Sequence, residues 1–244
     1  MIRVAVCLII LNVNIIDTGF LEQQKKYPRV RQAIDQSLKN IDTLFKSKGV
    51  GFPAQKIFLR VFKSEQKIEL WAKSSKVDTF CQIKSYKFCS TSGVLGPKTK
   101  QGDFQIPEGF YHLNRFNPHS IFHLSLGINY PNNADRILNK NNNLGGDIFI
   151  HGDCVTIGCI PITNALIKEL YVIAVYSKNS GQSKIPVHIY PAKMSQINLE
   201  KINRSFNDKH KIFWANLKDG FDYFEKKHKL PKIIINQSGQ YSFK

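Results

Sequence analysis

A short apolar run ends in a histidine, and a glycine-cysteine pair follows shortly after it. The run is Asp147 to Ile150, the histidine is His151, and the pair is Gly158-Cys159. A thiol is only weakly ionised at neutral pH, so a cysteine that transfers acyl groups needs an imidazole to take its proton and a fixed turn to expose its sulfur. The chain therefore has to fold so that the end of this run and the turn after it meet.

Gly158 fits such a turn for two reasons. It removes the side chain directly before the sulfur, where a substrate carbonyl must approach closely. It also leaves the adjacent backbone amides free to face a developing oxyanion. Within hydrogen-bonding reach of each other, His151 and Cys159 would make a thiol acyltransferase.

Several further motifs surround this pair. They are Leu95-Gly96-Pro97-Lys98, Gln101-Gly102-Asp103, Ile106-Pro107-Glu108-Gly109-Phe110-Tyr111, Gly127-Ile128-Asn129-Tyr130-Pro131 and Leu144-Gly145-Gly146-Asp147. Together with His151-Gly152 and Thr156-Ile157-Gly158-Cys159, they resemble the YkuD-type L,D-transpeptidases of bacterial cell walls, most closely their YafK-like branch. The likeness spans roughly residues 57–190, and Thr156 stands at the usual serine position.

The resemblance implies a role for each site residue. Cys159 is the nucleophile, His151 is the general base and acid, and the backbone carbonyl of Gly152 orients the His151 ring. The amides around Gly158 form the oxyanion region, and Thr156 is expected in the substrate-binding part of the site. Many family members carry a second histidine before the Gly-Cys pair and an arginine after it. Ile157 and Pro161 stand at those positions here, so His151 must be the base.

Glu108 is a further substrate-binding candidate, because a carboxylate facing the cleft would bind an incoming ammonium group. Its position between Pro107 and Gly109 is also typical of a turn residue.

Other interpretations of the histidine and the cysteines stay open. A lone cysteine beside an apolar run is often part of the core. His151, Cys154 and Cys159 would be three ligands of a zinc site, but they lack a close-spaced cysteine pair and a fourth ligand. We therefore expect no metal and no cofactor. Cys154 is expected to pack beside the thiolate or modulate it, and a Cys154–Cys159 disulfide would inactivate the enzyme. A Cys81–Cys89 pair requires adjacent strands.

The fold class implied by the resemblance is mainly β with α: a mostly antiparallel β-sandwich catalytic domain with flanking N- and C-terminal helices. Residues 1–20 read as a hydrophobic leader, 21–55 as a helical segment, 56–190 as the catalytic domain and 191–244 as a helical extension. Helical periodicity runs from Val30 to Phe45 and from Trp214 to Phe224. Thr163 or Asn164 caps a helix that reaches about Ser177.

Strands are expected at six places. They are Ile57 to Lys63, Ile68 to Lys73, Phe110 to Leu113, Ile121 to Ile128, Asp147 to Ile150 and Pro186 to Tyr190.

Composition bears on partners and location. The 244 residues are 42% hydrophobic, which suits a globular chain, and they carry a formal net charge of +17. The basic residues are scattered and no nucleic-acid motif occurs, so we expect the anionic cell wall, peptidoglycan, as partner rather than nucleic acid. Arg3 and the apolar run from Val4 to Ile16 resemble a secretory signal, which predicts export to the periplasm or cell envelope. We expect a monomer.

The expected reaction is acyl transfer from a peptidoglycan stem peptide through a thioester on Cys159. The acceptor is the amine of another diamino acid, a lysine of a wall-anchored envelope protein, or water. The last case would make the protein an amidase that releases wall-bound protein. The alternative outside enzymes is a basic module that binds the cell wall or nucleic acid.

Overall fold

The computed structural model describes residues 19–244, so the predicted leader lies outside the described residues except at its last two positions. The helices are α1 (Phe20–Lys25), α2 (Pro28–Ser47), α3 (Asn133–Leu138), α4 (Asn164–Asn179), α5 (Gln196–Ser205) and α6 (Lys211–Lys227). The strands are β1 (Lys56–Phe62), β2 (Lys67–Lys73), β3 (Cys81–Lys87), β4 (Gly109–Asn117), β5 (Ser125–Ile128), β6 (Phe149–His151), β7 (Ile160–Pro161), β8 (Pro186–Tyr190), β9 (Ile233–Ile235) and β10 (Tyr241–Phe243).

Within residues 19–244, eight strands form a mixed sheet in the order β3-β2-β1-β8-β4-β5-β6-β7, and β9 pairs with β10 in a separate hairpin. The ladders are antiparallel except β1 with β8 and β6 with β7. Strand β4 joins the two halves, because its first half pairs with β8 and its second half with β5. The pairing shifts between Leu113 and Arg115, which marks a bulge.

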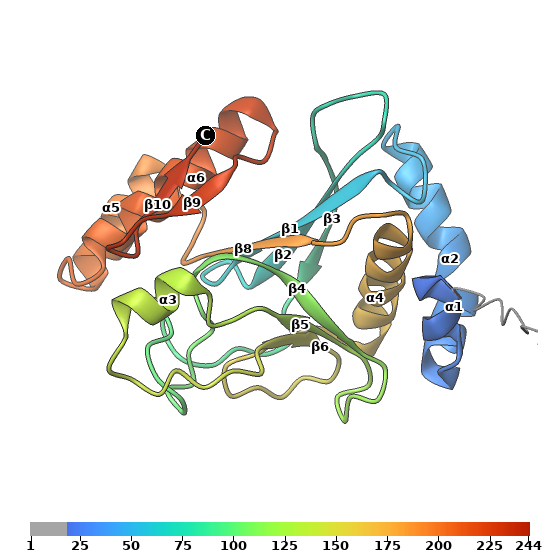
Figure 1. Cartoon of the computed structure of the whole chain (residues 1–244), viewed down its shortest axis with the longest axis horizontal. Coiled ribbons are helices and arrows are strands. Elements are labelled where there is room, and N and C mark those ends of the chain that lie inside the picture. Colours follow the sequence, from blue (N-terminus) through green and yellow to red (C-terminus); the bar gives the residue numbers. More distant parts are fainter. Residues whose placement is uncertain (1–18) are drawn as a thin grey trace, which may run out of the picture.

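Helices cover the sheet from two sides. On one side, α4 packs against β1, β5 and β6, and α2 packs against α4; apolar residues of both helices and of the sheet form the main core. At the other end of the molecule lie α5, α6 and the β9–β10 hairpin (Figure 1). Helix α6 packs on β1 through rings such as Phe224 and Phe58, whose centroids are 5.0 Å apart. This sheet-dominated fold with flanking helices confirms the predicted fold class.

The local predictions have mixed outcomes. The amphipathic helix, the first hairpin and the C-terminal helix are confirmed as α2, β1–β2 and α6. The Thr163 cap is confirmed too, because its hydroxyl accepts from the Leu166 amide at 3.4 Å. The strand predicted from Ile121 is too long. It begins only at Ser125, and Ile121 is 87% exposed.

Candidate active site

The predicted histidine and cysteine lie on neighbouring strands. His151 ends β6, and Cys159 directly precedes β7; the two strands pair in parallel with Ile150 opposite Ile160. Both isoleucines are fully buried in the main core. Because successive side chains on a strand alternate between faces, His151 and Cys159 both belong to the other, outer face. The structure thus brings them together as diagonal neighbours.

The His151 ring is held by its own backbone neighbour. Nδ1 lies 2.5 Å from the Gly152 carbonyl oxygen, and the ring packs against Phe122 at a centroid distance of 4.7 Å. A carbonyl oxygen only accepts, so Nδ1 carries the proton and Nε2 keeps its lone pair. Only glycine fits at position 152, because a Cβ there would lie 2.8 Å from the Phe122 carbonyl oxygen and nearer still to Asn164.

Cys159 is a partly buried free thiol. Its Sγ donates to the Asp147 carbonyl oxygen at 3.6 Å. Burial raises the pKa of the Cys159 thiol, against a smaller opposing effect of the Phe149 backbone amide. Burial also lowers the pKa of His151. Both shifts favour the neutral forms of the thiol and the imidazole.

The Thr156 hydroxyl organises the turn that carries Cys159. Its Oγ1 accepts from the amides of Gly158 and Cys159 at 3.2 and 2.8 Å and donates to the Cys159 carbonyl oxygen at 2.9 Å. Both amides are therefore engaged in this structure, which differs from their predicted oxyanion role. The hydroxyl thus holds the backbone of the segment 158–159. Its expected place in the substrate-binding part of the site stays a prediction. Gly158 adopts φ of 135°, a conformation that favours glycine.

Neither the Cys81–Cys89 pair nor the Cys154–Cys159 pair forms, and the expectation that Cys154 is a thiol beside Cys159 is wrong. Cys154 forms a disulfide with Cys89, while Cys81 and Cys159 are free. The Cys89 amide also donates to the Pro161 carbonyl oxygen at 3.1 Å, which places the disulfide beside β7. Cys154 is therefore neither a modulating thiol nor a partner for Cys159. It is also unable to act as a zinc ligand, and no cluster of three metal-ligating side chains occurs in residues 19–244.

Glu108 does not face a substrate cleft. It is fully buried, and its carboxylate pairs with Lys63 Nζ at 2.8 Å. It also accepts from the Gly96 amide and from Trp214 Nε1, both at 2.7 Å. These internal partners occupy the carboxylate, so the prediction that it binds an incoming ammonium group is wrong.

Sequence reasoning did not single out two participants. Asp147 accepts from the Cys159 thiol through its backbone carbonyl and adopts φ of 56°. It stands in the motif Leu144-Gly145-Gly146-Asp147, but nothing in the sequence indicated that its carbonyl would contact the Cys159 thiol. Cys89 was considered only as a partner of Cys81, and nothing in the sequence identifies Cys154 as its partner.

Comparison with known proteins now decides the family. Residues 56–189 match the model of the YkuD L,D-transpeptidase catalytic domain. The chain is 36% identical over 193 residues to "Putative L,D-transpeptidase YafK" of Escherichia coli (strain K12), an alignment that covers 78% of this chain and 74% of the relative. This chain belongs to the L,D-transpeptidase family. The resemblance drawn from its motifs is confirmed.

The chain also matches solved structures. The helical cell shape determining protein Pgp2 from Campylobacter jejuni superposes with a TM-score of 0.45 at 17% identity, covering 75% of this chain and 73% of Pgp2. L,D-transpeptidase 1 from Mycobacterium tuberculosis gives a TM-score of 0.31 at 11% identity, covering 55% and 61% of the two chains.

Proposed function

We propose that this L,D-transpeptidase family member is a cysteine enzyme that acts on peptidoglycan stem peptides during cell-wall remodelling. The observation that carries the proposal is the placement of His151 and Cys159 on one sheet face, with the Gly152 carbonyl holding the His151 tautomer. In this tautomer Nε2 can accept a proton. Residues 56–190 are then the catalytic domain.

The first half-reaction forms a thioester. Sγ of Cys159 attacks the carbonyl carbon of the third stem residue, a diamino acid, while its proton passes to Nε2 of His151. The C–N bond to the terminal D-alanine breaks, and His151 returns the proton to the leaving amine. In the second half-reaction an acceptor amine attacks the thioester and restores the thiol. If water is the acceptor, the same site hydrolyses the peptide.

The disulfide supports the proposed location. Disulfides form and persist in oxidising compartments such as the periplasm, and Cys89–Cys154 lies beside the proposed nucleophile's strand. Export to the cell envelope is therefore part of the proposal. Within residues 19–244 no helix is long and apolar enough to span a membrane.

Substitution of each free thiol tests the mechanism. Cys159→Ala should abolish D-alanine release from a tetrapeptide muropeptide, measured by mass spectrometry, because it removes the attacking atom. The matched control is Cys81→Ala, which removes the other free thiol of residues 19–244 and should leave the rate unchanged. His151→Gln should lose activity as Cys159→Ala does. Continued D-alanine release by Cys159→Ala would refute the cysteine mechanism, and the ratio of dimers to tripeptide monomers identifies the acceptor.

A further inference from the structure

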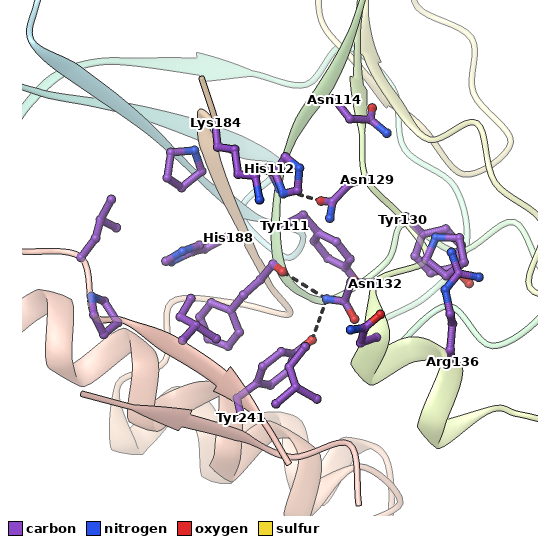
Figure 2. A pocket seen from close by; sticks show the side chains of 18 residues that line it. Tyr111, His112, Asn114, Asn129, Tyr130, Asn132, Arg136, Lys184, His188 and Tyr241 are labelled. Carbon is purple, nitrogen blue, oxygen red and sulfur yellow. Dashed lines mark hydrogen bonds between the residues drawn. The ribbon is translucent and has the colours of Figure 1, made fainter. Parts of the chain in front are cut away.

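A cavity of about 720 Å³ lies between the sheet and the C-terminal hairpin (Figure 2). Its walls come from β4, from residues 129–136 around the start of α3, from residues 184–188 and from residues 230–241. The last wall lies outside residues 56–189, which match the family model. The cavity therefore combines the family domain with this chain's C-terminal segment.

The charge of the cavity is positive. Arg136 and Lys184 both line it, both are exposed, and neither takes part in an ion pair among residues 19–244. No residue in its described lining is acidic. Asp135 lies behind it, but burial raises the pKa of this carboxyl to about 7, so at neutral pH it offsets only part of the positive charge. An anion entering the cavity meets two cations that have no ion-pair partner.

The rest of the lining suits a ligand with amide groups. Asn129 accepts from the His112 amide at 2.7 Å through Oδ1, which leaves its NH2 group directed to other partners, and Asn114 also lines the cavity (Figure 2). Side-chain amides pair with the donor and acceptor of a peptide group. His188 in the wall is 2% exposed, and its Nδ1 has no partner among the described residues. Such an orphaned buried atom is uncommon in folded proteins.

The cavity and the nucleophile occupy the same sheet face. Asn114 at the cavity rim lies over Gly127 of β5, where a Cβ would be 3.0 Å from Asn114 Oδ1 and 3.1 Å from the Phe149 ring. The Phe149 amide in turn reaches the sulfur of Cys159. From β4 to β7 is three strand spacings, about 14 Å. An extended peptide of about four residues covers this distance.

We propose that this cavity holds a carboxylate-bearing stem peptide while the peptide's reacting carbonyl, or that of a neighbouring stem, lies at Cys159. Arg136 and Lys184 project from opposite sides of the cavity (Figure 2) and bind carboxylates of the peptide, and the asparagine amides bind its peptide groups. The inference rests on the proposed function for its choice of ligand. The binding itself needs no catalysis.

The test measures binding without turnover. In Cys159→Ala protein, a muramyl tripeptide with free carboxylates is titrated calorimetrically at fixed ionic strength. Replacing both cations, Arg136→Gln with Lys184→Gln, should weaken binding at least tenfold. Amidation of the peptide carboxylates should likewise weaken binding at least tenfold to protein that keeps Arg136 and Lys184. The matched control is Lys201→Gln with Arg204→Gln on exposed positions of α5, which removes equal charge and should change affinity less than twofold.

Each alternative outcome is distinct. Unchanged affinity in the Arg136→Gln, Lys184→Gln protein overturns the proposal. If Arg136→Gln unfolds the protein, Lys184→Gln is measured alone, and unchanged affinity in that variant also overturns the proposal. Equal binding of inorganic phosphate, with competition, would show a general anion site and overturn the peptide ligand. Equally tight binding of an unrelated acidic tripeptide would overturn the claim that the ligand is a stem peptide of the cell wall. Failure of the proposed cysteine mechanism would be seen in a separate measurement, as D-alanine release that continues in the Cys159→Ala protein.

Discussion

At the scale of single residues, the Thr156 hydroxyl is the contact that most directly shapes the turn of the proposed nucleophile. Its oxygen accepts from the amides of Gly158 and Cys159, and its O–H donates to the Cys159 carbonyl oxygen. Thr156→Val keeps the side-chain shape and leaves these backbone groups without their partner. We expect kcat/KM for D-alanine release to fall at least tenfold, an effect of about 1.4 kcal/mol on the barrier.

Thr156→Ser is the matched control for this prediction. Serine keeps the hydroxyl and stands at this position in the family motif, so activity should stay within a few-fold of the original. Wild-type kinetics in Thr156→Val would show that the turn does not depend on this hydroxyl.

The ionisation of Cys159 gives a second prediction at this scale. Burial raises the thiol pKa, so at a given pH less thiolate is present than on an ordinary cysteine, and the thiolate fraction rises only at higher pH. Alkylation of Cys159 by iodoacetamide, followed on its own peptide by mass spectrometry, should be slower at pH 7 than that of glutathione. It should accelerate with pH to beyond pH 9. Rapid alkylation at pH 7 that disappears in His151→Gln would instead indicate a preformed thiolate–imidazolium pair.

At the scale of elements, the Cys89–Cys154 disulfide ties two segments together. Cys89 follows β3, and Cys154 lies in the loop between His151 and Cys159, 65 residues further along the chain. Closing a loop of this length limits the unfolded chain and anchors the connection between the two proposed catalytic residues. The link thus bears on stability and on activity.

Cys89→Ser with Cys154→Ser should therefore lower the free energy of unfolding by about 2–4 kcal/mol, measured by urea denaturation. We also expect a loss of kcat/KM, because the loop that spaces His151 from Cys159 loses its anchor. Cys81→Ser, which removes a free thiol, serves as the control and should change neither quantity appreciably. An unchanged unfolding midpoint in the double variant would contradict the anchoring role.

At the scale of the whole molecule, a buried ion pair joins the sheet to the C-terminal extension. Lys63 follows β1, Glu108 precedes β4, and Trp214 of α6 donates to the same carboxylate. Lys63 also donates to the Gly96 and Ile106 carbonyl oxygens at 2.8 and 2.9 Å. Burial lowers the pKa of Lys63, with the Glu108 charge acting in the opposite direction. The cluster thus holds the segment 96–108 between two parts of the fold.

Lys63→Met should destabilise the protein by about 3–5 kcal/mol in urea denaturation, because it leaves Glu108 buried without its partner charge. Adding Glu108→Gln should recover part of that loss, since the uncompensated charge disappears. Lys46→Met removes an exposed pair with Asp42 and should cost less than about 1 kcal/mol. Equal losses for Lys63→Met and Lys46→Met would contradict the role of the cluster.

Local patterns in the sequence determined several elements of this protein. The spacing of apolar residues predicted α2 and α6, and the Thr163 cap predicted the start of α4. The first hairpin and β8 also followed from short apolar runs between turn residues. Such signals lie within one window of the chain, so no distant partner is needed to interpret them. The motifs around His151 and Cys159 identified the family for the same reason.

The tertiary structure alone decided the partners. It paired Cys89 with Cys154, buried Glu108 against Lys63 and Trp214, and aligned β6 with β7. It also formed the cavity from four separated segments. Strand β3 and the short elements α3, β7 and the β9–β10 hairpin were not predicted, because little in their local sequence distinguishes them from loops. Contacts between distant residues depend on how the whole chain packs, and a single sequence does not record which of its cysteines or carboxylates will meet.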